Sequence, residues 1–276
     1  MKMIRESPKM EYPIDNFEIA KSNLLRFDGE GEFYMVLVLK RRKDTKGKMS
    51  EGVNEDNRLI KHYFVYDKEY LEKKKKAIEN LCEQNNARAY LLPQRRSCRI
   101  ALWGLHDKVS ETLKCGSMNV HFDHLIRSCV AGLHETSEKW HKRWVIDIDA
   151  DDAETFITAT AWRDEHSSPV SDNFVVREYA AWLAYKFRSA LVAKSGARLE
   201  EACQFMPKAG HEYKDEDVTM LETPHGFHIV TPPFNRDKKA MEKYFGVGCP
   251  MPEWIKPDAM ALLYAPMNIV ESKREG

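Results

Sequence analysis

The sequence has no excess of charge of either sign, because 43 lysines and arginines stand against 43 aspartates and glutamates. A chain-wide basic surface for nucleic acid is therefore not indicated, and any phosphate-binding surface has to come from local clustering of cations. No apolar run approaches the length that spans a bilayer, so we expect no membrane partner. Internal repeats and low-complexity tracts are missing as well.

Cysteine usage is irregular: the six cysteines form no regular framework, and the first residues form no apolar signal segment. Both features favour a reducing compartment, and we expect a cytoplasmic protein. Hydrophobic residues make up 43% of the chain and charged residues 31%, which is typical of a folded globular protein. The 276 residues suffice for one large domain or two small ones.

A short stretch at residues 143–149 alternates apolar and acidic side chains in the manner of a strand. Asp147 and Asp149 would share one face of this strand, while Ile146 and Ile148 would share the other. Two like charges so close together repel each other unless something compensates them. A divalent cation is one compensation, since Mg²⁺ and Mn²⁺ favour carboxylate oxygens. Solvation, or pairing with arginine or lysine, is the other interpretation.

Apolar periodicity predicts a mixture of strands and helices along the rest of the chain. Residues 1–30 are polar and irregular and are expected to form an arm. Asp67 is expected to cap the first long helix. Strands are predicted at residues 33–39, 62–66, 87–93 and 259–265 and in a hairpin over 218–234, and helices at residues 68–83, 97–135, 153–163, 175–193 and 236–245.

Arginines gather near the ends of two predicted strands. Arg42 follows the first strand, Arg88 lies on the third, and Arg95 and Arg96 follow the carboxyl end of the third. Ligands of α/β sheets gather at strand carboxyl ends, and the guanidinium group is shaped for bidentate contact with phosphate. These residues are therefore candidate phosphate ligands, with a solvated strand end as the alternative.

Four possible zinc ligands occur in one stretch: Cys115, His121, His124 and Cys129. Thiolate and imidazole groups are the usual ligands of structural zinc. The spacing is not that of a standard finger, and no Cys-x-x-Cys pair is present. A small buried cysteine with surface histidines is the other interpretation.

The predicted hairpin carries a second cluster of chemically active residues. Two apolar runs flank Thr-Pro-His-Gly, which is a turn signal. Gly226 would let backbone approach a ligand closely, and His228 lies just inside the second strand. Either His228 or His225 is a candidate to hold a nucleotide phosphate, and exposed turn residues are the alternative.

The order of these features resembles the catalytic core of the archaeo-eukaryotic primase superfamily. In that family an acid-x-acid strand binds two metal ions, a Ser-x-His motif touches the phosphate of the incoming nucleotide, and a later acid completes the metal site. Asp147 and Asp149 match the first motif. His228 matches the second, with Gly226 at the place of the serine, so that one hydroxyl of the expected contact set is lost.

The third motif has two candidates, because Glu253 and Asp258 both precede the predicted strand at 259–265. Glu253 is favoured. The resemblance covers roughly residues 33–265 in the order of its elements. Neither a helicase domain nor a clear zinc module of that family accompanies these motifs.

The resemblance implies an α+β fold, in which an N-terminal α/β unit packs on an RRM-like antiparallel sheet. A single catalytic domain would span residues 31–276 after the arm at 1–30. Within it, residues 31–135 would form the α/β subdomain and residues 140–270 the RRM-like, metal-binding subdomain.

The implied function is metal-dependent nucleotidyl transfer by a DNA primase or primase-polymerase. Nucleoside triphosphates, a single-stranded DNA template and replication proteins such as a helicase are the implied partners. Two Mg²⁺ or Mn²⁺ ions would clamp the attacking oxygen and the leaving pyrophosphate. The implied site comprises catalytic Asp147, Asp149 and His228, metal ligands Asp147, Asp149 and Glu253, and nucleotide contacts from Arg42, Arg88, Arg95, Arg96, Gly226 and His228.

Two alternatives stay open. A chain that keeps the fold but has lost activity would be a nucleic-acid-binding or nucleotide-binding replication protein, and the missing serine favours it. A metal-dependent phosphodiesterase or nuclease is the other, because two aspartates on a strand suit hydrolysis equally well.

Overall fold

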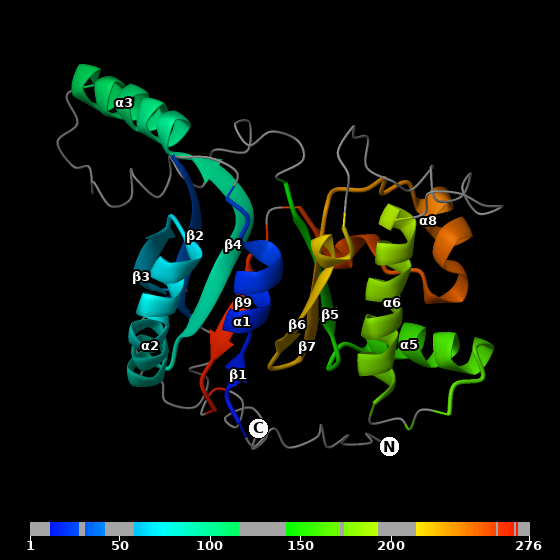
Figure 1. Cartoon of the computed structure of the whole chain (residues 1–276). Helices are drawn as coiled ribbons and strands as arrows, with labels where there is room; N and C mark the ends of the chain where they lie inside the picture. Colours follow the sequence, from blue (N-terminus) through cyan, green and yellow to red (C-terminus); the bar gives the residue numbers. More distant parts are fainter. Residues whose placement is uncertain are drawn as a thin grey trace.

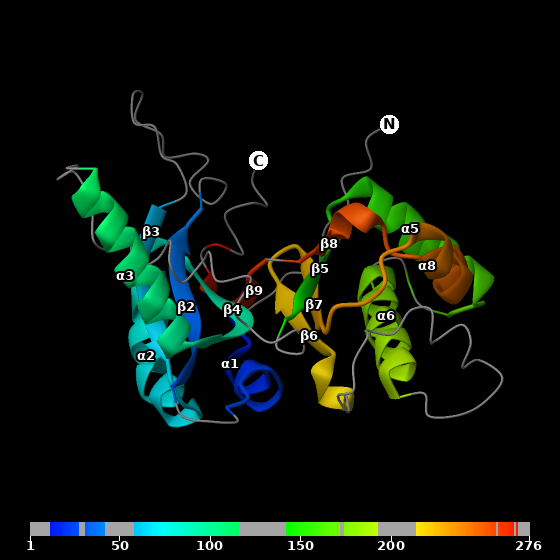
Figure 2. The same cartoon turned by 90° about the horizontal axis from the view of Figure 1, so that it is seen from above.

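Two antiparallel β-sheets form the framework of the protein, and helices cover them (Figures 1 and 2). The sheets and helices make the chain an α+β protein, as predicted. This computed structural model describes residues 12–27, 31–41, 58–115, 142–169, 171, 174–192, 214–257, 259–267 and 269. Within these ranges, no helix combines the length and the apolar character needed to cross a membrane.

The first sheet has the strand order β1-β9-β4-β2-β3. Its strands are β1 (Ile14–Asp15), β2 (Glu32–Lys40), β3 (Arg58–Val65), β4 (Arg88–Ser97) and β9 (Ala261–Ala265). β3 and β4 both run antiparallel to β2, which lies between them, so β3, α2 (Lys68–Asn85) and β4 form a split βαβ unit. The Asp67 carboxylate accepts a hydrogen bond from the Tyr70 N–H at 2.5 Å, which confirms the predicted N-cap of α2.

β4 is longer than predicted, which corrects the placement of two arginines. The predicted strand ended at residue 93, but β2 offers further partners, so that Phe33 pairs with Arg96 across a register shift. Arg95 and Arg96 therefore lie inside the strand and not beyond its carboxyl end. Helix α3 (Cys98–Lys114) follows directly, and the predicted helix beyond residue 115 lies outside the described residues.

The second sheet has the strand order β6-β7-β5-β8. Its strands are β5 (Trp144–Asp149), β6 (Thr219–Thr223), β7 (Gly226–Thr231) and β8 (Ile255–Lys256). β6 and β7 form the predicted hairpin around a two-residue turn. Figure 1 shows α5 (Ala153–Glu165), α6 (Val175–Val192) and α8 (Lys238–Phe245) on the side of this sheet that faces away from the first sheet.

The two faces of β5 serve different cores, because its side chains alternate. Ile146 and Ile148 are fully buried and pack with residues of α5, α6 and α8. On the opposite face, Val145 joins Leu221 and Val230 in a core that continues into the first sheet. The face that carries Asp147 and Asp149 is thus the one turned toward the first sheet.

A buried asparagine joins the two sheets. The Asn16 amide nitrogen donates to the carbonyl oxygen of Glu222 on β6 at 2.9 Å and to that of Leu262 on β9 at 3.0 Å. Its amide oxygen accepts a hydrogen bond from the Glu222 N–H at 3.3 Å. One side chain just after β1 therefore satisfies backbone groups of both sheets, which fixes their relative position.

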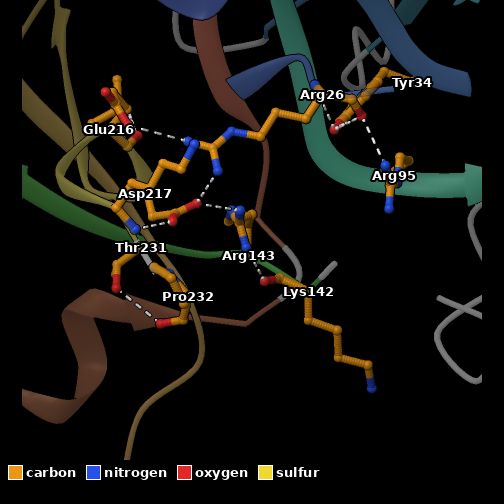
Figure 3. Close-up of polar contacts among 11 residues, drawn as sticks. Arg26, Tyr34, Arg95, Lys142, Arg143, Glu216, Asp217, Thr231 and Pro232 are labelled. Atoms are coloured by element: carbon orange, nitrogen blue, oxygen red, sulfur yellow. Dashed lines mark hydrogen bonds and ion pairs between the residues drawn. The ribbon is translucent and has the colours of Figure 1, made fainter. Parts of the chain in front are cut away.

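A second junction is ionic and surrounds Asp217, whose side chain is fully buried (Figure 3). Its Oδ1 lies 2.9 Å from the Arg26 guanidinium and 2.8 Å from that of Arg143. Its Oδ2 accepts a hydrogen bond from the Lys214 N–H at 2.7 Å. Arg26 follows the short helices α1 (Phe17–Ile19) and η1 (Ala20–Leu24), whereas Asp217 ends the 3₁₀ turn η5 (Asp215–Asp217) beside β6.

The two sheets do not follow the predicted subdomain ranges. β9 was expected in the subdomain at 140–270, but it pairs with β4 and β1 in the first sheet. β1 comes from the stretch expected to form an arm, at residues 1–30. The reason is that β9 is buried throughout and that Ile14 of β1 packs with Leu262 and Ala265 of β9, which completes this side of the first sheet.

Candidate functional site

The predicted acidic pair lies on one face of β5 in register with the hairpin strand β7. Asp147 pairs with His228, and Asp149 pairs with Gly226. Directly opposed residues on antiparallel strands have their side chains on the same face and in contact range. The register therefore brings together four of the residues that the sequence singled out.

Both carboxylate oxygens of Asp147 have cationic or donor partners. Oδ2 lies 2.5 Å from the Lys256 ammonium on β8, and Oδ1 lies 3.4 Å from His228 Nε2. Burial raises the pKa of the Asp147 carboxyl, but the hydrogen bonds from His228 and Lys256 and the positive charge of Lys256 outweigh burial and hold that pKa well below its usual value. Asp147 is therefore an ionised and largely compensated carboxylate at neutral pH.

The His228 imidazole is oriented by the first sheet. Its Nδ1 accepts a hydrogen bond from the Leu262 N–H on β9 at 3.1 Å. A ring nitrogen that accepts carries no proton, so the proton of the neutral ring is assigned to Nε2, which faces Asp147. The backbone of one sheet thus fixes the tautomer of a side chain on the other.

A second group of potential metal ligands lies at the end of β5. Ligand atoms of Asp149, Asp151 and His225 all lie within 4.8 Å of one another. The Asp151 N–H donates to Asp149 Oδ1 at 3.1 Å, and His225 Nδ1 lies 2.6 Å from Asp151 Oδ2. The Ala150 N–H donates to the His225 carbonyl oxygen at 2.6 Å, which ties the hairpin turn to this end of β5.

The electrostatics of Asp149 differ from those of Asp147. Burial raises the pKa of the Asp149 carboxyl, and repulsion from Asp151 and Asp147 adds to the increase, so hydrogen bonding and His225 only partly offset it. Two carboxylates and one imidazole form a donor set that suits Mn²⁺, which accepts both oxygen and nitrogen ligands. The residues present at this end of the strand therefore fit a divalent cation.

Gly226 has a steric role that the sequence did not reveal. A Cβ atom at this position would lie 2.0 Å from the Ile148 carbonyl oxygen and 3.0 Å from the Ala150 nitrogen, both of them backbone atoms of the neighbouring chain segment. The serine that the resembling family carries here has no room in this hairpin. Gly226 is thus required for the close approach of β7 to β5.

Replacing Gly226 with serine is expected to lower the free energy of unfolding by about 1–3 kcal/mol, because the added atoms overlap fixed backbone. Urea denaturation monitored by circular dichroism would measure the change. Gly31→Ala measures backbone strain without steric overlap, since its added Cβ meets no atom within 4 Å and its φ of 77° alone opposes the substitution. A serine variant as stable as the parent would contradict the steric role.

The predicted nucleotide-binding arginines are placed differently from the acidic pair. Arg88, Arg95 and Arg96 are buried in the first sheet. Arg95 contacts the Glu32 carboxylate at 3.1 Å and donates to the Arg26 carbonyl oxygen at 3.2 Å. The guanidinium group of Arg95 therefore binds other groups of the fold. Contact of the three arginines with a nucleotide stays a prediction.

Other predicted residues lie apart or outside the described ranges. Glu253 is exposed in the short turn η7 (Pro252–Trp254) and is not part of the ligand group around Asp149. Its role as third metal ligand stays a prediction. Cys115 is exposed just after α3. The remaining predicted residues, Arg42, His121, His124, Cys129 and Asp258, lie outside the described residues.

Three residues of the site were not assigned to it from the sequence. Asp151 precedes the helix predicted at residues 153–163 and belongs to none of the motifs, and His225 is only the alternative to His228. The turn signal places His225 at the tip of the hairpin. Knowledge of the register of β5 and β7 would therefore have predicted that His225 lies close to Asp151. Lys256 left no such signal, because it follows Asp147 by 109 residues and reaches it only through the pairing of β8 with β5.

Comparisons with protein-family models, with curated proteins and with solved structures give no match for this chain. The resemblance to the primase superfamily therefore rests on the motif residues alone, and the function has to be argued from the geometry of these residues.

Proposed function

We propose that the chain is a metal-dependent nucleotidyltransferase of the primase or primase-polymerase type. The observation that carries this proposal is the register of β5 and β7, which sets His228 beside Asp147 and closes the hairpin turn over Asp149 and Asp151. Phosphoryl transfer needs positioning and charge neutralisation more than a protein nucleophile. A cluster of carboxylates and imidazoles on one rigid strand pair supports that chemistry.

The residues divide into two roles under this proposal. Asp149, with Asp151 and His225, would hold a divalent cation, which when bound supplies a positive charge for the phosphate oxygens and the attacking hydroxyl. The Nε2 proton of His228 faces Asp147, and it would be a hydrogen-bond donor for a phosphate oxygen bound beside that carboxylate. The Lys256 ammonium is half-exposed beside it and offers a second positive charge. Nucleoside triphosphates and a single-stranded DNA template are the proposed substrates.

A specific observation favours one alternative, a binding protein without activity. Lys256 already compensates Asp147 at 2.5 Å, and Gly226 leaves no room for the hydroxyl that the resembling motif carries. Both features reduce the contacts expected of an active centre. Hydrolysis of a phosphodiester is a further alternative, because the same acids suit either reaction.

Extension of a labelled primer on a single-stranded DNA template, with Mn²⁺ and nucleoside triphosphates, separates the three functions. We expect template-dependent growth of the primer that stops when EDTA removes the cation. Shortening of the strand would instead identify a phosphodiesterase. Template or nucleotide binding with neither growth nor cleavage would identify a binding protein, and both results would reject the proposal.

A further inference from the structure

The charges around β5 fall into two separate groups. Asp147 has one partner at each carboxylate oxygen, the Lys256 ammonium at Oδ2 and His228 Nε2 at Oδ1. Its negative charge is balanced by the positive charge of Lys256 without any ion. A direct ion pair of this kind occupies the oxygen atoms that a metal ligand has to present.

The group at the end of the strand consists of two carboxylates and one imidazole. The carboxylates belong to Asp149 and Asp151, and the imidazole of His225 lies with Nδ1 2.6 Å from Asp151 Oδ2. Their ligand atoms already lie within 4.8 Å of one another, held by the hydrogen bond from the Asp151 N–H to Asp149 and by the tie between Ala150 and His225. Two carboxylates and one imidazole form a set of oxygen and nitrogen donors that suits one divalent cation such as Mn²⁺.

We propose that the centre takes one divalent cation, at Asp149, Asp151 and His225, and that the Lys256 ammonium occupies the place of a second cation at Asp147. The inference deepens the proposed function and rests on it, since it specifies how the same centre is charged. It departs from the two-ion arrangement that the sequence resemblance implies. The ammonium is covalently attached, so this half of the charge compensation does not depend on the metal concentration.

Lys256 has the properties that this role requires. It comes from β8, whose backbone pairs with β5, so the amine reaches Asp147 from a fixed neighbouring strand. It is half-exposed, with 48% of its side chain accessible, so that removal of its charge leaves the hydrophobic core intact. The described part of the chain thus offers a substitution that tests the charge and leaves the fold in place.

The test is the number of Mn²⁺ ions bound by the full chain, measured by isothermal titration calorimetry and by electron paramagnetic resonance of free Mn²⁺. We expect one equivalent for the parent chain, and a second equivalent for Lys256→Met, because the variant leaves the Asp147 carboxylate uncompensated. Lys256→Arg keeps the charge and should retain one equivalent. Lys238→Met removes an exposed lysine that pairs with Glu242 on α8, and this matched control should also retain one.

Asp149→Asn locates the ion, and we expect it to weaken Mn²⁺ binding by at least about tenfold. The inference is overturned if the parent chain binds two Mn²⁺ ions or none. It is also overturned if Lys256→Met binds only one, or if Asp149→Asn binds Mn²⁺ with the affinity of the parent. Failure of the proposed function gives a different pattern, in which Mn²⁺ binds as expected but no primer is extended.

Discussion

The substitution Asp149→Asn is expected to reduce metal-dependent nucleotide incorporation by about 10³-fold or more. The reason is that a bound metal ion contributes several kcal/mol of charge stabilisation to phosphoryl transfer. Asp149 lies at the centre of the ligand group, hydrogen-bonded to the Asp151 backbone and close to His225. The substitution keeps the size and the acceptor oxygen of the side chain and removes its charge. Single-turnover primer extension at saturating Mn²⁺ would measure the loss.

The same substitution should leave the fold as stable as the parent or more stable. The pKa of the Asp149 carboxyl is raised by burial, so at pH values above this pKa the ionised group costs folding free energy. Asparagine removes that cost, and we expect an equal or higher melting temperature in metal-free buffer. In the parent chain Mn²⁺ should raise the melting temperature, whereas in the variant this increase should be lost.

Asp164→Asn is the matched control for activity, since Asp164 is an exposed acid on α5 that pairs with its neighbour Arg163. It should incorporate nucleotide at the rate of the parent. An Asp149→Asn chain that retains incorporation would reject a metal centre at this position. A chain that loses incorporation only because it unfolds would be recognised by its melting temperature.

Asp217→Asn is expected to have the largest effect on stability, a decrease of about 3–5 kcal/mol in the free energy of unfolding. The Asp217 side chain is fully buried, and its Oδ1 serves Arg26 and Arg143 at 2.9 Å and 2.8 Å. Removing its charge leaves two guanidinium groups without their shared counterion at the junction of the sheets. Denaturation by guanidinium chloride, followed by tryptophan fluorescence, would measure the change.

Glu216→Gln is the neighbouring control. Its carboxylate lies 3.8 Å from the same Arg26 but is 56% exposed, so the pair is screened by water and should contribute less than about 1 kcal/mol. Similar losses for the two variants would mean that burial does not decide the strength of this junction. Restoration of Asp217→Asn stability by high salt would argue against a buried pair as well.

Local patterns in the sequence predicted the elements that depend on local chemistry. The alternation of β5, the cap at Asp67 and the turn before Gly226 were all confirmed, because each depends on residues within a few positions of one another. The mixture of strands and helices followed from the same patterns, whereas the α+β class was implied by the resemblance. The acidic face of β5 was likewise predictable, since side chains on a strand alternate without reference to the rest of the fold.

The partners of that face were not predictable, because they come from distant parts of the chain. Lys256 reaches Asp147 across 109 residues, and Asp217 reaches Arg143 across 74. No periodicity encodes such pairings, which depend on strand order and register. Arg95 and Arg96 were misplaced for the same reason: the length of β4 is set by its partner β2, and not by its own composition.

The order in which the chain is made gives β9 a further importance. It is the last strand of the described chain to be synthesised, yet it lies between β1 and β4 in the first sheet. Until it leaves the ribosome, β4 is an open edge, β1 has no strand to pair with, and the Leu262 N–H that orients His228 is missing. The centre on β5 is therefore completed only after β9 has been synthesised, so a nascent chain that has not reached Leu262 carries Asp147 and Asp149 without the backbone group that orients His228.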